Sequence, residues 1–186
     1  MMAVAALLAT GASAQDFSRK GMFDVGVIGQ YMTSSEKVTA FGVVGEVSIN
    51  NAGGGLDLTY HLTDHLALNI DTMVGNSDFK VKALGMSVSD SATFFGSNLN
   101  LDYNILKGPF TPFVTGGVGF QVYSGAIHGT TLSETDFTWN VGAGLRYNFN
   151  NHWYAKTSYC AIWGALESTG TDGVFHTATF GLGYRF

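Results

Sequence analysis

The sequence predicts an all-β fold, an eight-stranded antiparallel up-and-down transmembrane β-barrel. From residue 21 onward, apolar residues recur at every second position in eight separate stretches, which is the period of a β-strand. The connections between these stretches alternate between short and long. Charged residues make up only 12% of the chain, whereas about 25% is typical of soluble domains. A closed barrel whose outer surface meets lipid accounts for all three observations.

Each predicted strand has about ten residues or slightly more, the length that a tilted strand needs to cross a bilayer. The eight strands are expected over residues 22–33, 53–62, 66–75, 93–105, 112–123, 137–149, 153–163 and 176–186. Short turns join the second strand to the third, the fourth to the fifth and the sixth to the seventh. The intervening segments are longer, rich in Gly, Ser and Thr, and are expected to be loops: 34–52, 76–92, 124–136 and 164–175. This alternation, with an even number of strands, is typical of an outer-membrane barrel.

The two faces of each strand differ as a lipid-facing barrel requires. In the sixth strand, Phe137, Trp139 and Val141 share one face, and Asn140 and Arg146 lie on the other. A soluble sandwich also alternates, but the polar faces here carry Gly, Asn, Thr and single charges, with few of the Lys and Glu residues that cover a solvated sheet. The apolar faces of six strands carry no charge, which agrees with a cost of about 2–4 kcal/mol for Lys or Arg at mid-bilayer. In the ambiguous seventh strand, we assign the lipid face so that Lys156 points inward.

The first residues of the chain differ from the rest. A run of small apolar residues ends in Ala12-Ser13-Ala14 before Gln15, the pattern of a secretory cleavage site. The run is too short to span a membrane and lacks a positive n-region. We therefore expect residues 1–14 to be a signal peptide truncated at its start, and residues 15–186 to be one outer-membrane barrel domain. The alternative is a buried N-terminal helix.

Several kinds of function are disfavoured by the composition. The nine Lys and Arg residues are scattered in a chain of net charge −5, so nucleic acid is not an expected partner. Cys160 is the sole cysteine, which excludes an internal disulfide and an all-cysteine zinc site. His61 and His65 flank the Thr63-Asp64 turn, and with Asp64 they could suggest a metal site, but no further ligand is in view. The pattern His-x-Ser, expected for a barrel with lipid deacylase activity, is absent from the sequence. The glycine-rich stretches lie within strands and are not followed by a helix, so they do not indicate a nucleotide-binding site. We expect no cofactor, no metal and no enzymatic activity, with lipid hydrolysis or acyl transfer as the weakest hypothesis.

Four stretches carry a resemblance to known proteins: "LTYHLTDHLALNID" at 58–71, "PFVTGGVGF" at 112–120, "NVGAGLRYNFNNHWYAKTSY" at 140–159 and "FGLGYRF" at 180–186. The chain resembles the small eight-stranded outer-membrane barrels of Gram-negative bacteria, and within that class it is most similar to the OmpW family. The resemblance implies a location in the bacterial outer membrane and passage of small hydrophobic molecules through a lumen that opens sideways to the membrane. It also implies that Tyr184 and Phe186 belong to a C-terminal signal read by the barrel-insertion machinery. The expected partners are outer-membrane lipid, that machinery and a small hydrophobic ligand.

Charged residues on the inward faces form the first candidate site, a charge network in the lumen. Its members are Asp24, Asp57, Asp71, Asp102, Arg146, Lys156 and Arg185. Most lie within a few residues of the short turns, and closing the barrel from first strand to last places Asp24 beside Arg185. The alternative is a purely structural role, because interior ions pair where unpaired charges are costly.

Apolar inward residues farther from the short turns form the second candidate, a narrow apolar lumen pocket. They are Ile28, Met32, Met73, Phe94 and Ile162. Such a pocket over a polar plug suits a small apolar ligand, and the alternative is simple filling of the interior. The functional hypothesis is porin-like passage of small, hydrophobic molecules. The alternative is an OmpA/OmpX-like structural or adhesive surface barrel that acts through the 34–52 and 76–92 loops.

Overall fold

The computed structural model describes residues 18–40, 43–83, 86–127, 130–164 and 174–186. The expected signal peptide, residues 1–14, lies outside this described part. Eight strands pair with their neighbours in sequence order, and β1 pairs with β8, so the fold is the predicted closed antiparallel all-β barrel. The strands are β1 (Phe23–Ala40), β2 (Val43–His61), β3 (Leu66–Ala83), β4 (Met86–Asn104), β5 (Phe110–Ile127), β6 (Thr130–Asn148), β7 (Trp153–Trp163) and β8 (Phe175–Arg185). No helix within the described ranges could cross a membrane.

Short polar side chains fix the turns at one end of the barrel, which we call the short-turn end. The hydroxyl of Thr63 accepts hydrogen bonds from the backbone N–H groups of His65 and Leu66 at 3.1 and 2.8 Å. Asn150 Oδ1 accepts from the N–H groups of His152 and Trp153, both at 2.8 Å. Such side-chain caps replace backbone pairing where the chain reverses, which is why these residue types occur there.

The predicted long loops are largely wrong, because β1 to β6 continue through them. These six strands have 18 or 19 residues, against 11 in β7 and β8. Residues 34–40 pair with 43–49, and residues 79–83 pair with 86–90. These segments are polar, yet they keep β-branched residues such as Val47 and Val81 within Ser- and Thr-rich sequence. Of the fourth predicted loop, residues 165–173 lie outside the described part.

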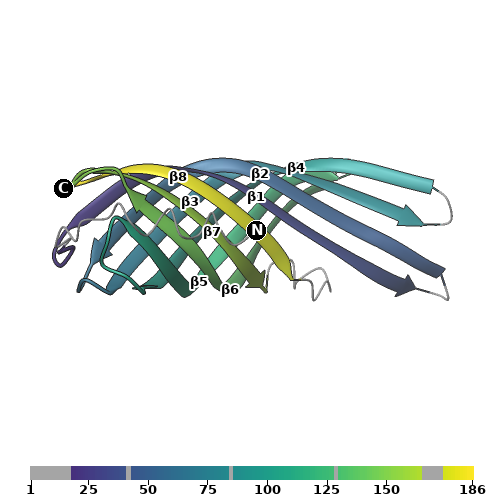
Figure 1. The fold of residues 1–186 in the computed structure, drawn as a ribbon. Helices are drawn as coiled ribbons and strands as arrows, with labels where there is room; N and C mark the ends of the chain where they lie inside the picture. Colours follow the sequence, from purple (N-terminus) through teal and green to yellow (C-terminus); the bar gives the residue numbers. More distant parts are fainter. Residues whose placement is uncertain (1–17, 41–42, 84–85, 128–129, 165–173) are drawn as a thin grey trace.

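The hairpins of β1–β2 and β3–β4 project farther than the rest of the barrel (Figure 1). Pairing of β1 with β8 ends at Thr33↔His176, and pairing of β4 with β5 ends at Thr93↔Ser124. Beyond these rows, the outer parts of β1 to β4 form a four-stranded extension, residues 34–40, 43–49, 79–83 and 86–90, which we call the outer sheet. Its position opposite the short-turn end defines the outer end of the barrel.

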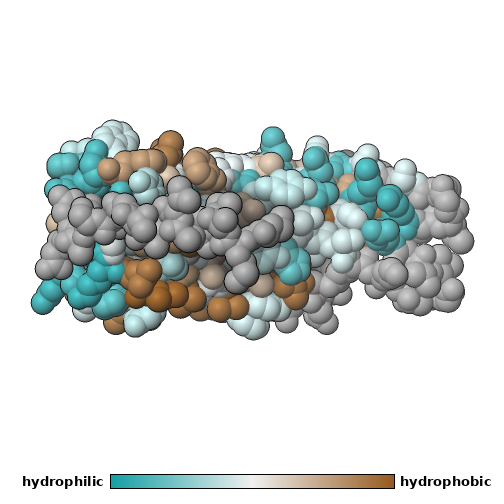
Figure 2. Space-filling model, viewed as in Figure 1, coloured by the Kyte–Doolittle hydropathy of each residue, from teal (hydrophilic) through white to brown (hydrophobic). Residues whose placement is uncertain are grey.

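A belt of exposed apolar side chains surrounds the barrel and stops below the outer sheet. On β6, Phe137 and Trp139 point outward with 68% and 50% exposure, whereas Arg146 is 3% exposed. On β3, the outward residues change from Leu68, Ile70 and Val74 to Asn76, Asp78, Lys80 and Lys82. Brown residues gather over the barrel in Figure 2, and teal residues are frequent towards both ends. The lipid layer therefore covers the barrel, and the outer sheet stands in water.

Candidate functional site

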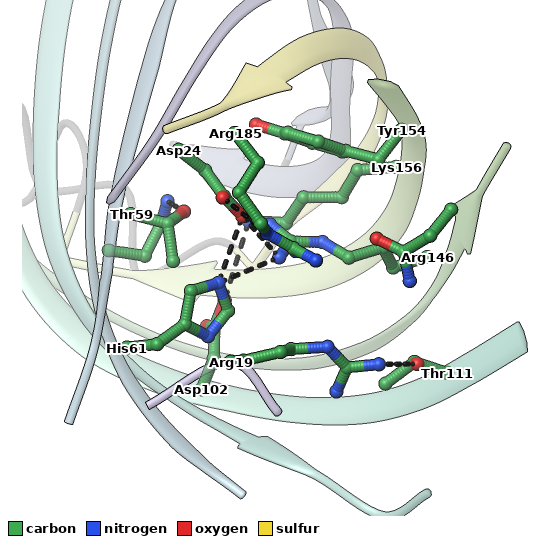
Figure 3. A network of polar contacts seen from close by, with 12 residues as sticks. Arg19, Asp24, Thr59, His61, Asp102, Thr111, Arg146, Tyr154, Lys156 and Arg185 are labelled. Atoms are coloured by element: carbon green, nitrogen blue, oxygen red, sulfur yellow. Dashed lines mark hydrogen bonds and ion pairs between the residues drawn. The ribbon is translucent and has the colours of Figure 1, made fainter. Parts of the chain in front are cut away.

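The lumen is filled in layers, and the first is a cluster of basic groups around one carboxylate. We call Arg19, Asp24, His61, Arg146 and Arg185 the basic cluster. Asp24 is fully buried and accepts from Arg146 Nη1 at 2.6 Å and from Arg185 Nε at 2.8 Å. His61 Nε2 lies 2.9 Å from Asp24 Oδ2 (Figure 3). One aspartate therefore joins β1, β2, β6 and β8 across the barrel.

Arg19 closes the short-turn mouth and was missed by the sequence reasoning. Its side chain is completely buried. The guanidinium donates to the carbonyl of Gly108 at 2.9 Å. It also donates to the hydroxyl of Thr111 on β5 (Figure 3). Burial, followed by the neighbouring guanidiniums, lowers the pKa of Arg19 to about 10, so it stays charged at neutral pH. Arg19 precedes the first strand, so no periodic pattern could mark it.

The segment that carries Arg19, residues 18–22, is anchored at the mouth and is called the N-terminal strap. Asp64 Oδ1 accepts from the backbone N–H of Arg19 at 2.9 Å and from that of Lys20 at 3.3 Å. Gly21 donates to the carbonyl of His61 at 2.8 Å and has a φ of 81°, which favours glycine. The backbone donor of Arg19 is the main cause that lowers the pKa of Asp64. The strap is thus held at one rim by Asp64 and at the other by Thr111.

A second layer of opposite charge lies farther in, and we call Asp57, Asp71, Asp102 and Lys156 the acidic layer. Lys156 Nζ lies 3.1 Å from Asp57 Oδ2 and 3.4 Å from Asp102 Oδ2. Asp71 stands apart, accepting from the amides of Asn98 and Asn100 at 2.7 Å each. Leaving His61 aside, the basic cluster holds three guanidiniums and one carboxylate, and the acidic layer holds three carboxylates and one ammonium. The two layers balance each other in total but not individually.

The seven charges expected from the sequence thus occur as two groups and one separate residue. Asp24 meets Arg185, its expected neighbour through first-to-last strand closure, and it also meets Arg146 from β6. Lys156 meets two aspartates from β2 and β4, on the opposite side of the barrel. These cross-lumen contacts join residues far apart in the sequence.

The third layer is a small cavity, which we call the mid-lumen cavity. Its volume is ≈ 50 Å³. Asp71, Lys156 and Thr177 contribute polar groups to its wall, and Ile28 and Ile162 are among its apolar lining residues. The cavity therefore has one polar side and one apolar side.

The outermost layer is a packed apolar cluster, which we call the apolar plug. The five residues expected to line an apolar pocket all belong to it, together with three that the sequence reasoning did not select: Ile28, Met32, Met73, Phe94 and Ile162, with Ile49, Tyr123 and Phe175. Met32 and Phe94 are 1% and 3% exposed and do not line the cavity. Tyr123 donates its hydroxyl to Gln121 Oε1 at 2.7 Å, which satisfies its polar end. Its eight side chains come from β1 to β5, β7 and β8 and pack into one buried cluster.

The described residues contain no cluster of three or more His, Cys, Asp or Glu suited to a metal ion. His61 and His65, which flank the 63–64 turn, have separate partners. His61 faces the basic cluster, and His65 Nδ1 lies 2.7 Å from the carbonyl oxygen of Asn104. Their separation follows from strand parity, because His61 continues the inward face of Thr59 whereas His65 lies outside the strands.

Tyr184 and Phe186 lie at the lipid-facing rim of the short-turn end. The rings of Tyr184 and Phe186 meet at 5.0 Å between centroids, and Tyr184 also contacts Trp153 and His152. Phe186 is 72% exposed, and its backbone N–H donates to the carbonyl of Phe23 at 2.8 Å. The last strand is thereby closed against β1.

The layered barrel also matches a known family. Residues 2–186 match the family model described as outer membrane protein beta-barrel domain. The chain belongs to this family. No protein among the curated ones matches the sequence. Family and fold place the protein in the bacterial outer membrane, so the short-turn end faces the periplasm and the outer sheet faces the exterior.

Solved structures of the same fold include three barrels of low sequence identity. The chain is similar to outer membrane protein OprG from Pseudomonas aeruginosa, with 16% identity, a TM-score of 0.63 and coverage of 90% of this chain and 97% of that chain. Neisserial surface protein A has 13% identity, a TM-score of 0.64 and coverage of 90% and 100%. Ail of Yersinia pestis has 16% identity, a TM-score of 0.57 and coverage of 90% and 99%. At such identities the likeness shows the shared fold.

Proposed function

We propose that this protein is a non-enzymatic surface barrel with a closed lumen, acting through the outer sheet formed by β1 to β4. The observation that carries the proposal is that six of eight strands continue past the lipid belt while the lumen beneath them is filled. A barrel serving only as a conduit has no need for strands of 18 or 19 residues. The filled interior makes the barrel a rigid anchor for the outer sheet.

Passage along the lumen would require rearranging the charged layers. A molecule leaving the mid-lumen cavity towards the periplasm meets the Lys156 pairs, then Asp24 with its two arginines, then Arg19. Depriving a buried charge of its partner costs about 3–5 kcal/mol. An apolar molecule offers no compensating hydrogen bonds. The geometry therefore supports a closed barrel over a porin.

The outer sheet has the features of a contact surface. Beyond Thr33, β1 pairs only with β2, and before Thr93, β4 pairs only with β3, among the described strands. Both edges therefore present backbone groups to which another chain can pair. The outer sheet carries three acidic residues and three lysines: Glu36, Glu46 and Asp90, with Lys37, Lys80 and Lys82. This balance disfavours a polyanionic partner.

Attachment is the activity to assay. The name of Ail describes attachment and invasion, and Ail was also crystallised with the heparin analogue sucrose octasulfate. The outer sheet has no excess of basic residues, which predicts that the present barrel does not share heparin binding. Attachment to a protein matrix is the expected mode instead.

Trimming the outer sheet at one row tests the proposal. Ser35, Ser48, Lys80 and Ser89 lie opposite one another in register. Replacing residues 36–47 and 81–88 each with Asn-Gly, a favoured two-residue hairpin turn, removes the projection and leaves the membrane belt intact. Bacteria displaying the full chain should adhere to a basement-membrane protein matrix several-fold more than cells with an empty vector.

The trimmed variant should adhere at the level of the empty vector. Its folding is checked by the gel mobility shift between unheated and heated samples. Immobilised heparin is the matched surface, and no difference between the full and trimmed chains is expected there. Equal adhesion by a folded, trimmed barrel would refute the proposed role of the outer sheet.

Uptake of a small hydrophobic molecule at the outer end is a second candidate. The resemblance to OmpW supports it, as does the apolar plug, in which Met32 and Phe94 lie on the outer side of the cavity. Methionine side chains repack readily, so the plug offers adaptable contacts. The test is quenching of a hydrophobic fluorophore by the purified barrel, which Phe94→Ala should alter. Unchanged binding in Phe94→Ala and Met32→Ala would eliminate this route.

A further inference from the structure

The mid-lumen cavity is large enough to hold an occupant. A water molecule needs about 10–15 Å³ of cavity volume. The ≈ 50 Å³ of the mid-lumen cavity therefore corresponds to about three to five waters. It lies between the acidic layer and the apolar plug. The basic cluster lies below it, towards the periplasm. An occupant is thus held between a polar wall and an apolar wall.

One carboxylate that borders this cavity lacks a cationic partner. Asp57 and Asp102 share Lys156, and Asp24 is paired with two arginines. Asp71 instead accepts only from the neutral amides of Asn98 and Asn100, and no Lys or Arg of the described ranges lies within 4.0 Å of it. Asp71 is partly buried, and a carboxylate partly withdrawn from water without an opposite charge favours a cation beside it.

Two further polar atoms at the cavity wall lack partners. Thr177 is 3% exposed, and its hydroxyl makes no hydrogen bond with any described residue. Asn98 Oδ1 is likewise buried and unpaired. Both residues line the same cavity as Asp71. Asn98 Oδ1 lies over Gly119 of β5, 2.3 Å from where a Cβ of that residue would stand. Buried oxygen atoms without partners are rare in native proteins, so the Thr177 hydroxyl indicates an occupant of the cavity that interacts with oxygen.

We propose that the mid-lumen cavity binds one small monovalent cation, an alkali ion or ammonium, through the carboxylate of Asp71, with the hydroxyl of Thr177 as the second oxygen. The carboxylate disfavours an anion. The set of neutral oxygens with one carboxylate disfavours a divalent ion, for which the described residues provide no cluster of acidic ligands. The Lys156 ammonium is engaged by Asp57 and Asp102, so Asp71 remains available. This site is independent of the role of the outer sheet.

Refolding in different chloride salts tests the site directly. The full barrel is refolded and crystallised in rubidium chloride, and anomalous scattering is used to locate the ion. We expect one peak in the mid-lumen cavity within contact distance of Asp71. Asp71→Asn should lose the peak, and Thr177→Val should reduce its occupancy. The matched control is Asp78→Asn, which changes the same residue type on the same strand at an exposed position.

Thermal unfolding gives a second readout. The wild-type barrel should unfold at a higher temperature in rubidium chloride than in choline chloride of equal ionic strength, because choline is too large for the cavity. Asp78→Asn should retain this difference, and Asp71→Asn should abolish it. A cavity that shows only water, a rubidium peak that persists in Asp71→Asn, or an equal salt effect in all three proteins would each overturn the proposal.

Discussion

The periplasmic half of the lumen and its outer half are held together by different interactions. In the periplasmic half, the carboxylate of Asp24 contacts Arg146, Arg185 and His61 at the same time. In the outer half, Met32 and Phe94 belong to a cluster of eight buried side chains without any ion pair. Polar networks fail together when one member is lost, whereas dispersion contacts are shared among many atoms. The stability of the periplasmic half should therefore depend on the charge and hydrogen-bonding groups of its side chains. The stability of the outer half should depend on side-chain volume.

The largest expected effect is that of Asp24→Ala, which leaves two buried guanidiniums without their carboxylate. Breaking a buried pair in this way costs about 3–5 kcal/mol. The measurement is the urea midpoint of the barrel refolded into lipid vesicles. Asp78→Ala, at an exposed position on β3, is the control and should change stability little. A loss for Asp24→Ala within the range of an exposed pair, about 1 kcal/mol or less, would show that the basic cluster is not structurally important.

The next effect is that of Met32→Ala in the apolar plug, which should cost about 2–5 kcal/mol by leaving a void. Met32→Leu sharpens the comparison, since a swap of similar volume costs less than about 1.5 kcal/mol. Asp24→Asn has similar volume too, yet it should remain strongly destabilising, because the charge is lost. If Met32→Leu and Asp24→Asn had equal effects on the urea midpoint, the distinction between the two halves would fail.

The same comparison explains how much the sequence could predict. The alternation of side chains along each strand is enough to predict that Asp24, Arg146 and Arg185 point into the lumen. Pairing of the first strand with the last predicts that Asp24 lies beside Arg185. The partition into two layers was not predictable, because the approach of Lys156 to Asp57 and Asp102 depends on the curvature of the whole barrel. The apolar residues were expected to line a pocket. Their packing into a plug depends on Tyr123 and Phe175, which come from β5 and β8 and fill the space.

The outer sheet and Arg19 could not be predicted from the sequence, for a different physical reason. The outer sheet was predicted as loops, since its strands are polar on the outward face once they leave lipid; Asn76, Asp78 and Lys80 follow Val74 on β3. Backbone pairing does not need an apolar face, so the ladder continues into water. Arg19 lies outside any strand and acts through carbonyl groups of the opposite turn, which no local pattern encodes.

A smaller effect is expected for Arg19→Ala, which removes the hydrogen bonds of the strap to Gly108 and Thr111. Hydrogen bonds from charged groups contribute about 1.5–3 kcal/mol. We expect Arg19→Ala to loosen the N-terminal strap and to leave the rest of the barrel folded. Trypsin should cleave after Lys20 faster in this variant than in the wild type. We expect no conductance in planar bilayers for either protein, because Asp24 with Arg146 and Arg185 still spans the lumen next to the strap. Steady current steps in either protein would contradict the closed lumen.

The smallest effect concerns the pH dependence of the strap anchor. Donors from Arg19 and Lys107 hold the pKa of Asp64 below its ordinary value of 3.8. For a carboxyl whose pKa is depressed by folding, the stabilisation is present above the ordinary pKa and is lost as pH falls through the folded value. The Arg19 amide, which donates to Asp64 Oδ1 at 2.9 Å, reports this directly. Its proton chemical shift should remain constant from pH 6 to about 4 and change only at lower pH. A midpoint at the ordinary aspartate pKa would mean that Asp64 does not anchor the strap, and the mouth would then depend on Arg19 and Thr111 alone.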